Sequence, residues 1–241
     1  MTMVSPHFLG LINELALLFP IFLLVFTFRG FFKALMAFMM GDNTPQRHGF
    51  LSLNPLVHLD IVGMSIFIIL FFLIGSILSG SIQRQLLLFM LLALGVRWTI
   101  DVPIDDSNFK HYKFGGIMTC LAGSIGNFLL AFVALAFLRF IPFSNLPPYA
   151  ALTFLEILNG IIDIGIWFGV LDLVPIPPFD AGYIFYYCLP YNKRFIISWL
   201  EEYSLIIIMI LFVVPIVSHV WWGLLSVASN FIKQGMFRLL F

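Results

Sequence analysis

Charged side chains are scarce in this sequence. Lys, Arg, Asp and Glu make up only 10% of its 241 residues, whereas 61% are hydrophobic. About a quarter of a typical soluble domain is charged, so the composition excludes an ordinary soluble protein. The formal net charge is zero, which excludes the broad basic surface that nucleic-acid binding requires. The chain is therefore predicted to be an all-α polytopic membrane protein that contacts membrane lipid.

Cysteine and N-terminal positive charge are also nearly absent. The two cysteines, Cys120 and Cys188, have a spacing that fits neither a disulfide framework nor a metal site, so both are predicted to be small packing residues. No Lys or Arg precedes Glu14, whereas a secretory signal peptide begins with a positively charged region. We therefore expect the first apolar segment to remain in the protein.

Apolar runs long enough to cross a bilayer recur along the chain. They predict about five or six transmembrane helices in a single domain, residues 1–241, and a break near residue 80 leaves the number open. The apolar segments are 8–41, 61–95 (interrupted at 79–84), 114–141, 150–173 and 205 to about 225. Between the first two segments, partial alternation in "HGFLSLN" predicts a short β-like segment near residues 48–54.

Positive charges in the polar segments indicate one side of the membrane, because cytoplasmic loops are enriched in Lys and Arg. Three polar loops that could share one side carry Arg47, Arg97, Lys110, Lys113, Lys193 and Arg194. That side is predicted to be cytoplasmic.

Three charged residues lie inside or beside apolar stretches. Arg29 and Lys33 are about one helical turn apart in "TFRGFFKALMAFMMGD", with no acid beside them. Asp180 lies in "VPIPPFDAG", whose prolines prevent a regular helix. Irregular backbone at membrane depth requires protein or a water-filled cavity around it, so Asp180 marks a candidate site. The alternative from this string alone is an interfacial loop with a solvated Asp180.

Three strings resemble, in the same order, the motifs of the site-2 protease family, the intramembrane zinc metalloproteases. They are "GDNTPQRHGFLSLNPLVHLDIVG" (41–63), "LAGSIGNFLLA" (121–131) and "LDLVPIPPFDAG" (171–182). The resemblance covers roughly residues 20–215 and implies a site-2-protease-like core. It implies that Asp180 corresponds to the third zinc ligand and that Asn127 lies near the substrate. The retained motif residues are Gly41, Asp42, Asn54, Pro55, His58, Asp60, Asn127 and Asp180.

The same resemblance implies that the catalytic residues of the family are missing. The two zinc-binding histidines would occupy positions 29 and 33 and the catalytic glutamate position 30, but the chain has Arg29, Gly30 and Lys33. Arg keeps its proton and cannot ligate zinc, Lys would have to lose one, and Gly supplies no base. We therefore expect no catalytic residue, and neither zinc nor another cofactor. If a metal is bound, the alternative ligands are His48, His58 and Asp180.

A cation at position 29 or 33 offers a substitute for zinc. In the family fold Asp180 would lie close to this face of the helix, and an unpaired carboxylate is costly in a low dielectric. We predict an ion pair between Asp180 and either Arg29 or Lys33 that joins two helices. The alternative is that both long side chains extend to the cytoplasmic interface without contacting Asp180.

The retained scaffold and the missing catalytic residues favour a pseudoprotease. Further motif positions differ from the family at Phe50, Ile61, Ser124, Asp172 and Ala181. Such a protein would lie in a bacterial cytoplasmic membrane and bind transmembrane or membrane-associated segments of partner proteins. The alternatives are an active intramembrane zinc metalloendopeptidase with a rebuilt metal site, and a transporter or structural subunit of a membrane complex.

Overall fold

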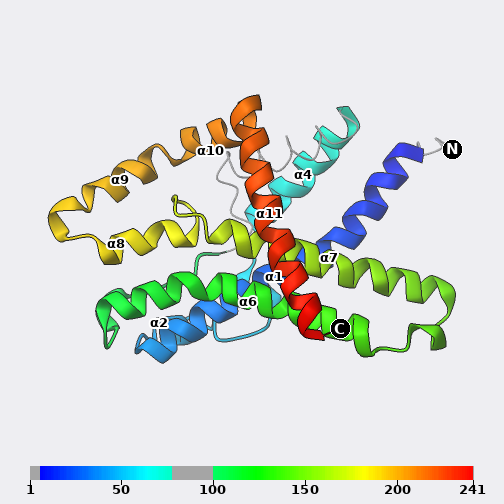
Figure 1. The fold of residues 1–241 in the computed structure, drawn as a ribbon, viewed down its shortest axis with the longest axis horizontal. Coiled ribbons are helices and arrows are strands. Elements are labelled where there is room, and N and C mark those ends of the chain that lie inside the picture. The colour runs from blue at the N-terminus through cyan, green and yellow to red at the C-terminus, as the bar shows by residue number, and fades with distance from the viewer. Residues whose placement is uncertain (1–5, 78–99, 241) are drawn as a thin grey trace.

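The computed structural model describes residues 6–77 and 100–240, which form helices joined by turns and irregular segments (Figure 1). In chain order these are α1 (Pro6–Met40), α2 (Thr44–Arg47), α3 (Pro55–His58), α4 (Ile61–Ile77), η1 (Asp106–Asn108), α6 (Tyr112–Phe140), η2 (Phe143–Asn145), α7 (Pro148–Asp172), η3 (Asp180–Tyr183), α8 (Ile184–Cys188), η4 (Tyr191–Lys193), α9 (Phe195–Glu202), α10 (Ser204–Val213) and α11 (Pro215–Leu240). The described part of the chain is all-helical, as the composition predicts.

Three of these helices are long and apolar enough to cross a membrane. Within the described residues the candidate spans are Leu9–Met40 in α1, Tyr112–Phe140 in α6 and Pro148–Asp172 in α7. The three helices pack on one another (Figure 1), and their shared core includes the fully buried Val25, Leu135 and Ile162. The chain is therefore an integral multi-pass membrane protein. The count of five or six crossings stays a prediction, because the break at 79–84 lies outside the described residues.

Glycines allow α6 to approach both of its long neighbours closely. A Cβ atom on Gly126 would lie 2.8 Å from the Phe32 side chain of α1. A Cβ atom on Gly165 of α7 would lie 3.3 Å from the backbone oxygen of Asn127. Membrane helices use such small residues because van der Waals packing, rather than hydrophobic burial, drives their association. This close packing holds α1 and α7 in place around the charged residues described below.

The end of α1 is fixed by the Gly41–Asp42 pair. Gly41 has φ +114°, a left-handed conformation that ends the helix and that glycine adopts without strain. Asp42 is fully buried, and its carboxylate accepts hydrogen bonds from the Thr44 amide at 2.9 Å, the Asp105 amide at 2.8 Å and the Asn108 side chain at 3.2 Å. This retained motif residue therefore connects the end of α1 to the loop before α6.

Asp42 is expected to make stability depend on pH. Burial alone would raise the pKa of Asp42, but the hydrogen bonds from Thr44, Asp105 and Asn108 outweigh burial and hold the pKa below its ordinary value. Replacing Asp42 by alanine leaves three donors without their acceptor and is expected to cost about 2–3 kcal/mol of unfolding free energy at neutral pH. Equilibrium unfolding in detergent, followed by tryptophan fluorescence, measures this cost.

The sign of the pH effect follows from the lowered pKa. The advantage of wild type over the alanine variant is expected to be constant above about pH 4, the ordinary carboxyl value, and to shrink as the pH falls through the lower folded-state pKa of Asp42. An advantage that grows on acidification would contradict the hydrogen-bonded carboxylate.

The predicted β-like segment near residues 48–54 is wrong. Residues 48–54 form turns and irregular backbone between α2 and α3. Local interactions favour a helix start here over the strand that the alternation suggests. The Asn54 side chain accepts a hydrogen bond from the Leu56 amide, and Pro55 begins α3. The last predicted span is also interrupted, since α10 ends at Val213 and Pro215 begins α11.

Several of the basic loop residues do lie at one end of the bundle. Arg47 is in α2, immediately after α1, and the Lys110 amide donates to the Met40 carbonyl at the end of α1. The Arg194 guanidinium lies over the Tyr186 ring at 4.4 Å and near the Tyr112 ring at 5.6 Å, which places it at the start of α6. That this end is cytoplasmic stays a prediction.

Candidate functional site: a buried charge network

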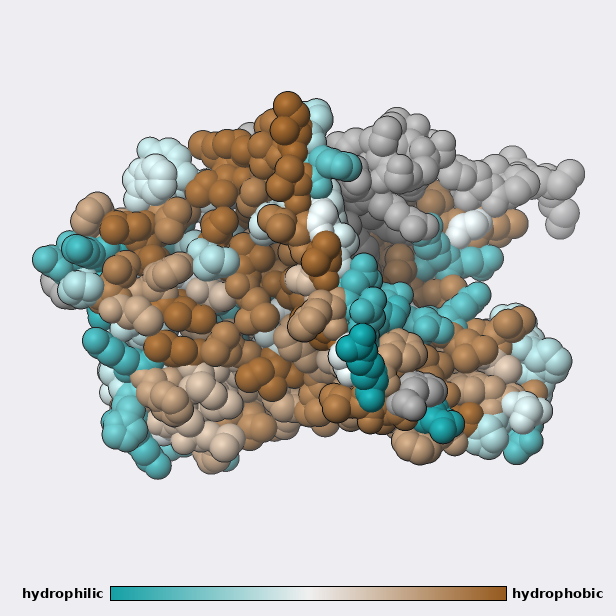
Figure 2. Space-filling view, in the orientation of Figure 1, coloured by the Kyte–Doolittle hydropathy of each residue, from teal (hydrophilic) through white to brown (hydrophobic). Residues whose placement is uncertain are grey.

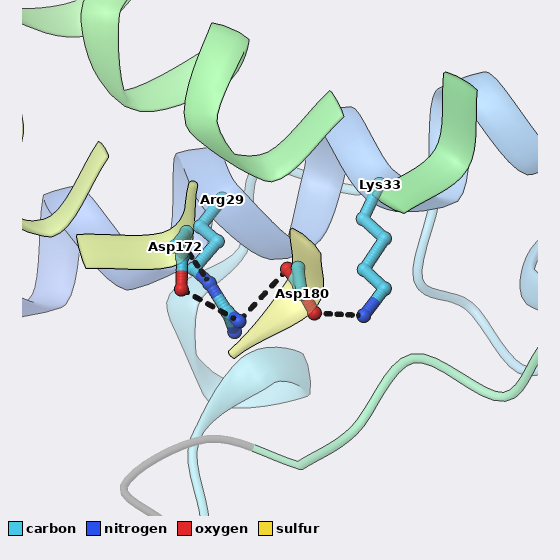
Figure 3. A network of polar contacts seen from close by, with 4 residues as sticks. All are labelled: Arg29, Lys33, Asp172 and Asp180. Carbon is cyan, nitrogen blue, oxygen red and sulfur yellow. Dashed lines mark hydrogen bonds and ion pairs between the residues drawn. The ribbon is translucent and has the colours of Figure 1, made fainter. Parts of the chain in front are cut away.

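Arg29 and Lys33 project from the same face of α1 toward two aspartates (Figure 3). Arg29 Nε donates to Asp172 Oδ2 at 2.6 Å, and Arg29 Nη2 donates to Asp172 Oδ1 at 3.2 Å and to Asp180 Oδ2 at 2.8 Å. Lys33 Nζ donates to Asp180 Oδ1 at 2.6 Å. Asp180 therefore bridges both cations, and Arg29 bridges both anions.

The two aspartates are placed by the end of α7 and by the chain that follows it. Asp172 is the last residue of α7, and the turn after it contains Pro175, Pro177 and Pro178. These prolines supply no amide donor, so the chain cannot continue as a helix. A Cβ atom on Gly182 would lie 2.4 Å from the Pro177 nitrogen, so glycine lets the turn fold back tightly. Asp180 thereby returns to within reach of α1.

The network is buried and balanced in charge. The side chains of Asp172 and Asp180 are 6% and 5% exposed, whereas those of Arg29 and Lys33 are each 20% exposed. Within these four residues two cations face two anions, so their charges balance in the membrane interior, where a lone charge is costly. The Arg29–Asp172 contact is bidentate, the geometry in which guanidinium and carboxylate bind most strongly. We name these four residues the charge network.

Helix α6 covers the charge network through Gly123. A Cβ atom at this position would lie 3.1 Å from both the Arg29 Cγ and the Asp180 Oδ2 atoms. A larger residue would press on the guanidinium stem and the carboxylate together. The network is thus enclosed by α1, α6, the end of α7 and η3.

His58 lies directly over Gly30, the position of the catalytic glutamate in the family resemblance. A Cβ atom on Gly30 would lie 2.4 Å from His58 Nδ1, so the ring fills the space that a side chain at position 30 needs. His58 Nε2 lies 2.8 Å from the Ser52 carbonyl, which can only accept, so Nε2 carries the proton. Burial lowers the pKa of His58 and keeps the ring neutral.

In the described part of the chain, the remaining retained motif residues are not hydrogen-bond partners of the charge network. Asn54 begins α3, and Asp60 accepts from the Val62 amide at the start of α4. His48 is exposed after α2. Asn127 is fully buried in α6, and neither polar atom of its amide has a hydrogen-bond partner among the described residues. The structure thus joins Arg29, Lys33 and Asp180 and leaves His48 apart.

Asp172 is the functional candidate that the predicted ion pair omitted. Charge counting could have found it, because two cations against Asp180 alone would leave one positive charge unbalanced. Asp172 is also the nearest preceding acid, at the other end of the same proline-rich string. The sequence could not predict that Arg29, rather than Lys33, contacts both Asp172 and Asp180.

A curated relative supports the resemblance to zinc metalloproteases. The protein named "Putative zinc metalloprotease YwhC" from Bacillus subtilis (strain 168) is 26% identical over 211 residues, which cover 87% of this chain and 85% of the relative. The chain is a distant homologue of that metalloprotease. This homology confirms the resemblance. No protein-family model and no solved structure matches the chain.

The residues of this homologue do not fit a zinc ion at the charge network. Both oxygens of Asp180 accept hydrogen bonds from cations, and Arg29 and Lys33 are at the positions to which the family resemblance assigns histidine ligands. A divalent cation would meet two positive charges and no neutral nitrogen donor. Over residues 6–77 and 100–240, no group of three His, Cys, Asp or Glu residues has an arrangement suited to a metal. The alternative ligand set of His48, His58 and Asp180 is therefore not assembled.

Proposed function

We propose that this chain is a pseudoprotease of a bacterial cytoplasmic membrane, which binds transmembrane or membrane-associated segments of partner proteins without cleaving them. The charge network is the observation that carries the proposal. It occupies the position to which the family resemblance assigns a metal, and it joins α1 to the end of α7 as a metal would.

The residues at the catalytic positions supply neither a metal ligand nor a base. In a metalloprotease, zinc supplies an activated water and polarises the scissile carbonyl. Arg29 keeps its proton, and Lys33 holds its ammonium in a salt bridge to Asp180. Gly30 has no side chain, and His58 closes the space above it. These residues support a structural role for the former catalytic face of α1.

Two buried polar groups of α6 support binding of a partner segment. Asn127 and Ser124 are fully buried on the same helix, about one turn apart, and within residues 6–77 and 100–240 their side-chain polar atoms have no hydrogen-bond partner. Leaving such groups unpaired is costly. An extended segment of another protein that entered between the helices would offer backbone donors and acceptors to these buried groups, as in recognition by strand addition.

The transporter alternative is disfavoured by the same contacts. A polar path through the membrane needs charged groups that can bind and release a solute. Arg29, Lys33, Asp172 and Asp180 instead bond one another, which leaves them engaged in holding helices together. The alternative of an active peptidase is tested by metal content, as described at the end of the Discussion.

Site-specific photocrosslinking in native membranes tests the proposed binding. A photoreactive residue replaces Leu56, which is 73% exposed in α3, a helix that packs on α1 near the site. We expect adducts with transmembrane segments of partners at their uncleaved length. Asn127→Leu is expected to reduce the adducts about tenfold, since a lost buried hydrogen bond is worth about 1.4 kcal/mol.

The matched control places the photoreactive residue at Val133, on the outward face of α6. Adducts there are expected to be insensitive to Asn127→Leu. Equal sensitivity at both positions, or partners recovered as cleaved fragments, would contradict the proposed function.

A further inference from the structure

A second ion pair joins α7 to α11, outside the charge network. Lys233 Nζ lies 2.5 Å from Asp163 Oδ1, and the two side chains are 33% and 60% exposed. Neither residue belongs to a motif, and neither contributes to the site described above. The pair is therefore an exposed charged feature that the proposed function leaves without a role.

Asp163 lies deep in a candidate membrane span. It is in the part of Pro148–Asp172 that would cross the bilayer, about 22 Å along the axis from Pro148 and about 13 Å from Asp172. The hydrocarbon core is about 30 Å thick, so the pair falls within it. Charged groups at that depth face protein or water rather than lipid tails. This side of the bundle is therefore covered by something other than lipid.

Further polar residues extend this surface along both helices. On α7, Glu156 and Asn159 precede Asp163 by seven and four residues, so the three share one exposed helix face. On α11, a groove of about 380 Å³ is lined by Asn230, Lys233, Gln234, Phe237 and Arg238. Figure 2 shows hydrophilic side chains gathered in a band between hydrophobic surfaces, where α11 crosses α7. We name these eight residues the α7–α11 polar face.

The unpaired charges of this face are self-complementary. Asp163 and Lys233 neutralise each other, whereas Glu156 and Arg238 have no charged partner in the part of the chain that the structure describes. One carboxylate on α7 and one guanidinium on α11 therefore remain on the two helices that the Asp163–Lys233 pair joins. A two-fold interface pairs residue i with residue j and j with i, so two copies of this face would pair both charges twice.

We propose that the α7–α11 polar face is the interface of a homodimer within the membrane, in which Glu156 of each copy pairs with Arg238 of the other. The dimer removes the Asp163–Lys233 pair from lipid and offers partners across the interface to the amides of Asn230 and Gln234. This surface is distinct from Asn127 and Leu56, so each copy keeps its proposed binding site.

Cysteine crosslinking of the purified chain in liposomes tests the dimer. Asn159→Cys is made in a Cys188→Ser background, because Cys188 is exposed and Cys120 is buried. At low protein-to-lipid ratio, a short thiol crosslinker is expected to give a covalent dimer. Val133→Cys on the outward face of α6 is the control and is expected to stay monomeric.

Charge reversal identifies the contacts. Glu156→Arg or Arg238→Glu alone is expected to reduce the crosslinked dimer about tenfold, the effect of about 1.4 kcal/mol shared by two symmetric pairs. The variant carrying both reversals is expected to recover the wild-type yield, since the pairs are restored with exchanged signs. Both residues are exposed, so these variants are expected to fold.

Three results would overturn the dimer. The first is a doubly reversed variant that crosslinks as poorly as the single variants. The second is a yield at Asn159→Cys no higher than at Val133→Cys, as a water-filled groove would give. The third is crosslinking to another protein in native membranes but not to a second copy in liposomes.

Discussion

Asp180→Ala is expected to lower the free energy of unfolding by about 3–5 kcal/mol, because it leaves the two cations of the charge network with a single buried anion. Lys33 would lose its only anion in the network, and Arg29 would keep only Asp172. Equilibrium unfolding in mild detergent, followed by tryptophan fluorescence, gives the difference from wild type. Glu201→Ala on the exposed end of α9 is the control and is expected to change stability by less than about 0.5 kcal/mol.

A variant in which all four residues of the charge network become apolar separates two effects. One is the cost of an unpaired buried charge, and the other is the cost of losing the ion pairs themselves. Replacing Arg29 and Lys33 by methionine, and Asp172 and Asp180 by leucine, removes every charge together. Buried ion clusters replaced as a unit by apolar residues are often neutral or stabilising. We therefore expect this variant to be at least as stable as wild type and far more stable than Asp180→Ala. If Asp180→Ala cost under about 1 kcal/mol, the cations would not depend on Asp180.

Gly30→Ala is expected to destabilise the protein by about 1–3 kcal/mol, although alanine is the better helix former. The added methyl group would lie 2.4 Å from His58 Nδ1, and the ring is fixed by the Ser52 carbonyl. Gly10→Ala is the matched control on the same helix. No atom of the described residues lies within 4 Å of a Cβ atom at Gly10, so this change is expected to stabilise by about 0.5–1 kcal/mol. If His58 contacts position 30, the changes in unfolding free energy caused by Gly30→Ala and Gly10→Ala should have opposite signs.

A double-mutant cycle assigns the Gly30 effect to His58. His58→Ala removes the ring, so Gly30→Ala should then cost little or become stabilising. The same contact predicts the fate of a restored family motif. Introducing a glutamate at position 30 places a longer side chain against His58, so restoring the three catalytic positions alone is expected to lower stability and to give no peptidase activity. An additive cycle would show that His58 does not occupy this space.

The membrane class and the motif residues could be predicted from the sequence because both depend on local chemistry. Apolar runs predict spans from length and hydropathy, and the Gly-Asp end of α1 follows from the conformational freedom of Gly41. The prediction of a short β-like segment near residues 48–54 was wrong because alternation over seven residues is a weak signal. Asn54 and Pro55 together begin a helix that the alternation does not indicate.

The finer geometry of the site depends on distances that no sequence pattern contains. Helical spacing places Arg29 and Lys33 on one face, but the return of the chain after α7 decides which anions they reach. The Gly30–His58 contact joins residues 28 positions apart in the chain. A glycine at position 30 indicates that the catalytic base is missing. The contact of the His58 ring with this position can be found only from the three-dimensional structure.

Elemental mass spectrometry of the purified protein tests the central claim most directly. The claim is that the charge network replaces the metal of the homologous peptidases, and the measurement is bound zinc per chain in wild type and in Asp180→Asn. The account predicts no zinc above the buffer blank in either protein, even after incubation with added zinc. A stoichiometric zinc in wild type that disappears in Asp180→Asn would contradict it, and His58 would then be the first ligand to test.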